Sequence, residues 1–310
     1  MCGLAAMLLA AWLPGAAAEP AAARIETDYD PGAFSIGAAG VDTWIVRSAT
    51  IVSGYYGRFP VPVLRLAVVP VEGRGVHGGT AYPGRGPGIR VRLGADTPAE
   101  SLLGDWVLVH EMIHLALPEL ADRHAWLSEG LATYVEGMAR VAAGNLSEQA
   151  LWQEYVESMP KGEPAAGDLG LDRTATWART YWGGALFCLN ADVAIRRATA
   201  NRRGLRDALR GILAASGGMR TEWPIERVLA TGDAATGTDV LESLYRAQRA
   251  TPVSTDLAAL WRELGIEVRD GQVQLAAEGP AAALRRALTA PDPTTPAPAP
   301  PELVRAGRSG

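Results

Sequence analysis

The sequence predicts an α+β fold in which a small, mainly antiparallel β-sheet stands N-terminal to a mostly helical region. Residues 24–93 are rich in Val, Ile, Tyr, Gly and Pro, and their short apolar runs are bounded by Gly, Pro or Asp, which is typical of strands. From residue 98 onward, apolar residues recur mostly at helical spacing. The 310 residues are 48% hydrophobic, enough to bury a substantial core in one large domain or two smaller ones.

These patterns divide the chain into five parts. They are, in order, a signal peptide at residues 1–18, a β-rich part at 19–95, a helical core at 96–200, a helical C-terminal part with a short hairpin at 201–288, and a disordered Pro-rich tail at 289–310.

The first 18 residues form an apolar run that ends in three small residues, Ala16 to Ala18, as expected before a cleavage site. The run is shorter than the ~20 residues of a membrane-spanning helix. Because no Lys or Arg precedes it, an uncleaved anchor is the alternative. We expect a secreted or periplasmic protein, or a membrane-anchored one if the segment is not cleaved. Cleavage leaves Cys188 as the one cysteine, which excludes an intrachain disulfide and predicts a buried, inert thiol.

Three runs in the β-rich part are expected to be strands, and they begin at Trp44, Val63 and Gly88. The glycine-rich segment 73–88 between the last two is typical of a loop or an irregular edge strand. Because it precedes the helix that carries the chemistry, we expect it to flank the cleft.

That helix has a well-marked start. Thr97 is placed as the N-cap, Pro98 at the first helical position and Glu100 three residues after the cap. The pattern predicts a helix that runs to about Leu117 and is ended by Pro118. Its surface is apolar nearly all round, so its polar residues should lie in the interior.

Residues 108–115 of this helix read Leu-Val-His-Glu-Met-Ile-His-Leu. His110 and His114 are four residues apart and share one helix face, where two imidazoles can bind one metal ion with Glu111 beside it. A single histidine in a core is usually structural, but the chain has only four histidines, and this spacing is seldom a coincidence. The spacing predicts a zinc site of the hydrolytic type.

Hydrolysis at zinc needs a third protein ligand and an open fourth position. Glu129, in the next helical pattern, is the candidate ligand. His124 competes with it, but its place in the connecting turn favours a solvated or outer-shell role. Glu136 lies seven residues after Glu129 on the same helix face, where it either orients a ligand or faces water.

Residues 126–132, Trp-Leu-Ser-Glu-Gly-Leu-Ala, resemble the Trp-Leu-Asn-Glu-Gly-Phe-Ala stretch of the gluzincin metallopeptidases, especially the membrane-alanyl and glycyl aminopeptidase families (peptidase MA-like). The resemblance covers Gly104 to about Glu136. It implies a zincin-like fold and one Zn²⁺ per chain. It also implies the ligands His110, His114 and Glu129, and Glu111 as the base that activates water.

A second stretch, residues 180–186, resembles the Tyr-x-Lys-Gly-Ala segment of the same families. There the tyrosine hydroxyl donates to the oxyanion, which nominates Tyr181 here, with a packing role as the alternative. Gly183 replaces the lysine. Those families also carry a Gly-x-Met-Glu-Asn strand whose glutamate holds the substrate's free amine. The corresponding segment 78–81 has no acid, so aminopeptidase specificity is not implied and endopeptidase or exopeptidase cleavage is left open.

The remaining elements are mostly helical. Residues 145–148 resemble a capping box that opens a helix through Ser158, and 161–172 should be a surface loop at the cleft rim. Amphipathic patterns predict further helices, and an Asp-Gly pair predicts a hairpin. These elements are four helices at 205–215, 223–230, 240–248 and 256–264, a hairpin at 264–275 and a last helix at 281–288.

The formal net charge of −5 and the lack of a dense Lys/Arg run argue against nucleic acid or an anionic membrane surface as partner. We expect a peptide or protein substrate, and membrane contact only through an uncleaved N-terminal segment. Two alternatives stay open. They are a gluzincin-fold binding protein without useful turnover, and a zinc hydrolase of a non-peptide substrate. The oligomeric state is not predicted.

Overall fold

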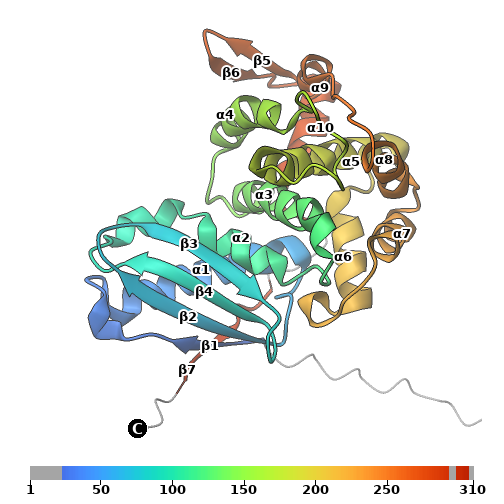
Figure 1. Cartoon of the computed structure of the whole chain (residues 1–310). Coiled ribbons are helices and arrows are strands. Elements are labelled where there is room, and N and C mark those ends of the chain that lie inside the picture. Colours follow the sequence, from blue (N-terminus) through green and yellow to red (C-terminus); the bar gives the residue numbers. More distant parts are fainter. Residues whose placement is uncertain (1–22, 293–297, 307–310) are drawn as a thin grey trace, which may run out of the picture.

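A five-stranded sheet lies beside a larger helical region in the structure, a computed structural model that describes residues 23–292 and 298–306 (Figure 1). The strand order in the sheet is β3-β4-β2-β1-β7. The strands are β1 (Arg24–Asp28), β2 (Val63–Val71), β3 (Val76–Tyr82), β4 (Gly88–Gly94) and β7 (Glu302–Arg305). The α+β class is confirmed.

The strand directions differ from the prediction. β1 pairs in parallel with β2 and with β7, and β2 pairs in parallel with β4. Antiparallel pairing within this sheet joins β3 to β4. The prediction of a mainly antiparallel sheet is therefore wrong. Two parallel neighbouring strands need a crossover connection between them. The helix that provides this connection is not among the predicted elements.

That helix is α1 (Gly37–Tyr56), which connects β1 to β2 and lies behind the sheet in Figure 1. The predicted strand at Trp44 lies inside it, so this prediction is wrong. Its Val and Ile content favours a strand, but its buried residues recur at helical spacing, at Val41, Trp44, Ser48 and Val52. Burial of one helix face outweighs the β propensity of single residues.

Glycine-rich β3 is the irregular edge strand that the sequence predicts. It lies at the end of the sheet, and its register against β4 shifts between Val76 and Gly79. The interior strands β2 and β4 alternate buried and exposed residues, for example Leu64 and Leu66 in β2 and Ile89 and Val91 in β4. The buried set shares a single core with α1 and with α2 (Val107–His114).

The helix that carries the motif is shorter than predicted. Residues Ala99–Gly104 form a 3-10 helix, and α2 covers Val107–His114. The chain turns at Asp105, whose carboxylate accepts hydrogen bonds from the amides of Val107 and Leu108. Thr97 is not the cap, because its hydroxyl donates to the carbonyl of Gly94. Asp105 opens α2 as an N-terminal cap would.

The remaining helices agree with the sequence patterns, and α3 packs against both α2 and α5. Ser147 caps α4 by accepting from the Ala150 amide, and Asp270-Gly271 forms the hairpin turn. Cys188 is buried, as expected. The elements are α3 (Ala125–Ala142), α4 (Glu148–Ser158), α5 (Gly184–Ala198), α6 (Leu205–Ser216), α7 (Ile225–Thr236), α8 (Val240–Gln248), α9 (Leu257–Glu263), β5 (Ile266–Arg269), β6 (Gln272–Leu275) and α10 (Gly279–Thr289).

Part of the predicted disordered tail is a strand. β7 pairs with β1 and so covers the edge that β1 would otherwise expose. Arg305 forms an ion pair with Asp42 of α1, 3.0 Å between nitrogen and oxygen, which ties the strand to the core. The prediction of disorder is wrong for this segment. The predicted signal peptide, residues 1–18, lies outside the described residues.

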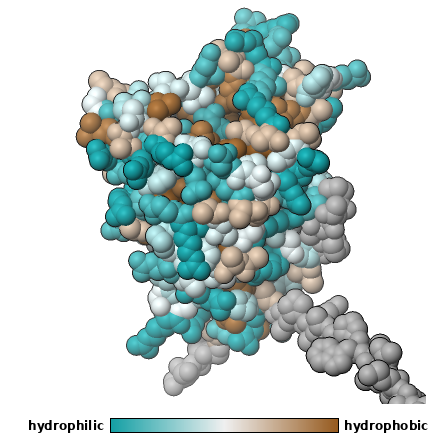
Figure 2. All heavy atoms as spheres, turned by 90° about the vertical axis from the view of Figure 1, so that its right-hand side faces the viewer, coloured by the Kyte–Doolittle hydropathy of each residue, from teal (hydrophilic) through white to brown (hydrophobic). Residues whose placement is uncertain are grey.

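The surface around α6, α7 and α8 faces the viewer in Figure 2. Hydrophilic and hydrophobic residues are interspersed there, with more hydrophobic residues in the upper half. Within residues 23–292 and 298–306, no helix combines the length and the apolar character needed to cross a membrane.

Candidate metal centre

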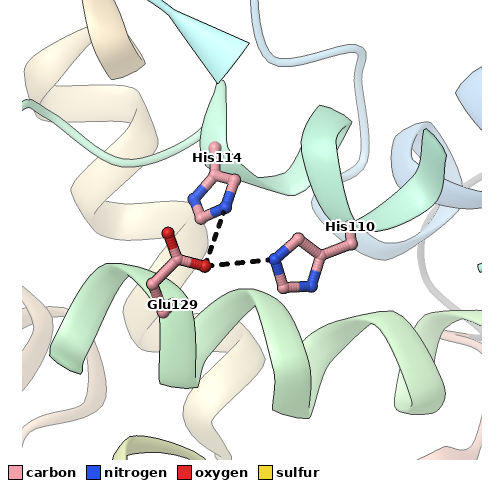
Figure 3. A group of neighbouring side chains, drawn as sticks. All are labelled: His110, His114 and Glu129. Atoms are coloured by element: carbon pink, nitrogen blue, oxygen red, sulfur yellow. Dashed lines mark hydrogen bonds and ion pairs between the residues drawn. The ribbon is translucent and has the colours of Figure 1, made fainter. Parts of the chain in front are cut away.

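Two helices bring His110, His114 and Glu129 together (Figure 3). α2 presents both imidazoles, and α3 presents the carboxylate. Glu129 Oε2 lies 3.3 Å from His110 Nε2 and 3.5 Å from His114 Nε2. All three ligand atoms lie within 4.8 Å of one another.

This donor set fits a zinc ion. Two imidazole nitrogens and one carboxylate oxygen make a common three-ligand set of catalytic zinc. Ligand atoms about 2.0–2.1 Å from a tetrahedral zinc lie roughly 3.3–3.4 Å apart. The distances from Glu129 Oε2 to the two imidazole nitrogens are close to this spacing. Burial acts to raise the pKa of Glu129, but its contacts with His110 and His114 outweigh burial and hold that pKa well below its usual range. The carboxylate is therefore ionised, as a metal ligand must be.

The glycine after Glu129 sets the distance between the helices. A Cβ atom on Gly130 would lie 2.2 Å from the Cα of Gly184, where α5 begins, so only glycine fits without a shift. Trp126, one turn earlier, has its carbonyl oxygen against the same Gly184. This contact places Glu129 opposite α2.

Ser128 supports the centre from the residue before Glu129. Its Oγ lies 3.1 Å from His114 Nδ1. A partner on the second ring nitrogen fixes the orientation of a ligating imidazole. The sequence patterns do not predict this role, although Ser128 occupies the position of the asparagine in the resembled stretch. His110 Nδ1, by contrast, is buried without a hydrogen-bond partner among the described residues.

Glu111 lies in the same cavity and is buried against the edge strand β3. A Cβ on Gly79 would lie 2.6 Å from Glu111 Cγ, so the glycine leaves room for this side chain. Burial raises the pKa of the Glu111 carboxyl, and a hydrogen bond from the Ala81 backbone opposes that rise. Segment 78–81 thus flanks the site as predicted, and it contributes backbone and small side chains rather than an acid.

Tyr181 also reaches the centre. Its ring stacks on that of His110, with centroids 6.4 Å apart. Burial raises the pKa of Tyr181, and the nearby Glu129 carboxylate raises it further, to about 12. The hydroxyl is therefore a donor at neutral pH. The residue lies in a π-helical turn, Arg179–Gly183, of a kind frequent at functional sites. A buried ion pair of Arg179 with Asp168, 2.7 Å, anchors that turn.

The two competitors do not join the cluster. His124 is buried, and its Nδ1 lies 3.0 Å from Asp172, which also accepts from Trp126 and Tyr245. The prediction of a solvated His124 is therefore wrong, and the residue anchors the start of α3 instead. Glu136 neither orients a ligand nor faces open water, because it is buried and pairs with Arg140 at 3.2 Å.

The cavity around the three ligand atoms has a volume of about 280 Å³. Its lining also includes Glu119, which follows the motif helix, and Met219, which lies far away in the sequence. The sequence patterns do not single out either residue. Burial raises the pKa of Glu119, and the negative charge of the nearby Glu222 raises it further.

No protein-family model and no curated protein matches the chain. Solved structures do. An aminopeptidase N family protein from Idiomarina loihiensis is 13% identical with a TM-score of 0.57, over 83% of this chain and 50% of that one. An M1 zinc metallopeptidase from Deinococcus radiodurans is 18% identical with a TM-score of 0.45, over 75% and 50%. This chain spans about half the length of these structures.

The arrangement of sheet and helices is a zincin-like α+β fold. More narrowly, the chain has a gluzincin peptidase-like fold, as the resemblance in the sequence implies.

Proposed function

We propose that this protein is a zinc-dependent metallopeptidase. The observation that supports it most is the convergence of His110, His114 and Glu129 at zinc-like spacing in a cavity that also holds Glu111. A zinc ion bound there supplies a Lewis acid that polarises a carbonyl and makes water more acidic.

Glu111 is the general base of this proposal. Its carboxyl lies in the cavity with the ligand atoms, and its Cγ packs against Gly79 of β3. It takes the proton of the attacking water and then passes that proton to the leaving amine. A base on a rigid helix, held by the neighbouring strand, keeps its orientation through both transfers.

Tyr181 supplies a hydrogen bond to the carbonyl oxygen as that oxygen gains negative charge. Its hydroxyl interacts with Glu129 in the structure, and its high pKa keeps it a donor. Stacking on His110 keeps the phenol next to the ligand set.

Metal analysis of the purified protein tests the ligand set. We expect one zinc per chain, and a stoichiometry well below one after Glu129→Ala or His114→Ala. His77→Ala is the matched control, since His77 is exposed on β3 and does not line the cavity. Full zinc content in Glu129→Ala would contradict the assignment of the third ligand.

A broad peptide-library digest, with and without chelator, tests the chemistry. Chelator-sensitive cleavage supports the peptidase, and the positions of the cuts decide between endopeptidase and exopeptidase action. Stoichiometric zinc without cleavage of any peptide would contradict the proposal and favour a binding protein or a hydrolase of another substrate.

A further inference from the structure

A second pocket of about 190 Å³ adjoins the metal centre and shares His110 and Tyr181 with it. Aromatic residues make much of its wall, namely Trp106, Trp177 and Trp182. Two carboxyl groups, from Glu136 and Glu154, also line it. The proposed mechanism uses none of these five residues.

The aromatic wall is partly open to solvent. Trp106 is 50% exposed and Trp177 is 62% exposed, although indole rings are usually far more buried. Trp177 stacks on Tyr181 with ring centroids 5.8 Å apart. These rings offer flat faces to a side chain that enters beside the metal centre.

Glu136 lies in the pocket with an incomplete set of hydrogen bonds. The residue is only 6% exposed, and its Oε2 accepts from Arg140 Nη1 at 3.2 Å. Its Oε1 has no hydrogen-bond donor among the described residues. This oxygen is not among the fully buried atoms without a partner, so it is open to the pocket, and an occupant that displaces water from it must bring a donor instead.

The cations around the pocket are already engaged. Arg140 also donates to the carbonyl of Gly104 and to Asn145, so it lies behind Glu136 rather than in the pocket. Lys161 donates to Ser158 at 3.1 Å, and its ammonium lies 5.8 Å from the centroid of the Trp182 ring. The wall thus already binds one cation through an aromatic face. The Glu154 carboxylate lies in the field of Arg140 and Lys161 but forms no ion pair with them, so it and the other indoles can still contact a second cation.

We propose that this pocket binds a basic side chain, arginine or lysine, of the peptide substrate next to the scissile bond. The inference rests on the proposed peptidase function. An aliphatic or phenyl side chain would cover Glu136 Oε1 without supplying a donor. A guanidinium or ammonium stacks on the tryptophans and donates to the Glu154 carboxylate and to a carboxyl oxygen of Glu136.

The first test measures binding, so that it does not depend on turnover. The zinc-loaded Glu111→Gln protein is titrated with N-acetyl-arginine amide, and tryptophan fluorescence reports occupancy. N-acetyl-citrulline amide has nearly the same shape without the charge, and N-acetyl-phenylalanine amide tests an apolar occupant. We expect the arginine probe to bind roughly 10-fold tighter than the citrulline probe, or better. Equal binding, or tighter binding of the phenylalanine probe, would overturn the proposal.

Second-site variants locate the effect. Glu154→Gln should reduce the preference for arginine over citrulline severalfold. Glu136→Gln should reduce it less, because burial raises the pKa of Glu136 to about 8 and leaves that carboxyl largely uncharged at neutral pH. Glu157→Gln is the matched control, because it removes an exposed carboxylate from the same helix, α4, outside the pocket. Glu136→Gln removes the ion pair with Arg140 and can disturb the fold. Glu154 is exposed, so Glu154→Gln should fold normally and keeps the test decisive. An unchanged preference in Glu154→Gln would contradict the proposal.

A digest of a randomised peptide library separates this inference from the proposed function. Cleavage next to Arg or Lys, weakened in Glu154→Gln, supports both. Cleavage without a basic preference overturns the pocket assignment and leaves the peptidase. Selective binding of the arginine probe without any cleavage supports the pocket and contradicts the peptidase.

Discussion

Gly130 and Gly184 meet backbone to backbone where α3 crosses the start of α5, one residue after Glu129. A methyl group on Gly130 would lie 2.2 Å from Gly184 Cα. Gly130→Ala should therefore push the helices apart, lower the free energy of unfolding by about 1–3 kcal/mol and reduce zinc content.

Urea unfolding and metal analysis of the same preparations check this prediction. Gly54→Ala is the control, because Gly54 lies within α1 and a Cβ there meets no atom within 4 Å. It should leave zinc unchanged and stabilise the helix by up to about 1 kcal/mol. A Gly130→Ala protein with normal stability and zinc would show that the close contact does not place Glu129.

Gly79→Ala tests the contact between β3 and the base. The new Cβ would lie 2.6 Å from Glu111 Cγ, so the carboxyl must move while the three ligands keep their places. We expect full zinc content with kcat at least ~10-fold lower, since small displacements of catalytic groups are costly. Gly104→Ala, where the Cβ meets open space, should behave like the unaltered protein. Normal kcat in Gly79→Ala would argue against Glu111 as the base.

Tyr181→Phe removes one hydroxyl and keeps the ring on His110. If the hydroxyl stabilises the oxyanion, kcat should fall by about 10²–10³ with little change in KM and none in zinc content. Tyr82→Phe, an exposed tyrosine on β3, is the control. Steady-state kinetics with unchanged kcat would assign Tyr181 to packing instead.

The buried carboxyl of Glu136 predicts a pH dependence of stability. Burial raises its pKa to about 8, with Arg140 opposing and Glu154 and Asp105 adding to the rise. The folded state therefore binds more protons than the unfolded state between about pH 4.5 and pH 8, so this residue lowers stability as pH rises through that window. Glu136→Gln, which resembles the protonated form, should lose this contribution.

Urea unfolding at several pH values between 5 and 8 compares the two proteins. The decline in free energy of unfolding with rising pH should be smaller in Glu136→Gln than in the unaltered protein. Identical slopes would mean that Glu136 keeps an ordinary pKa beside Arg140.

The sequence predicts that His110, His114 and Glu129 lie together because the determinants of this cluster are local. The four-residue spacing of His110 and His114 sets one helix face, and the stretch around Glu129 resembles a known segment. Element types in the C-terminal half follow from helical periodicity and from turn residues such as Asp270-Gly271.

The features that the sequence does not predict depend on contacts between distant parts of the chain. The direction of the strands depends on the crossover helix α1. The Val and Ile residues of α1 are compatible with a strand or a helix, and packing of its buried face decides between the two. β7 is defined by pairing with β1 at the other end of the chain. The pocket around Glu136 needs α3, α4 and the turn at Tyr181 together, so no single segment reveals it.

Peptide hydrolysis by the zinc-loaded Glu111→Gln protein, relative to the unaltered protein at equal zinc content, tests the central claim most directly. The substitution keeps the size of the side chain and removes the base. We predict stoichiometric zinc and a rate lower by about 10²–10⁴. Hydrolysis at the unaltered rate would contradict the account.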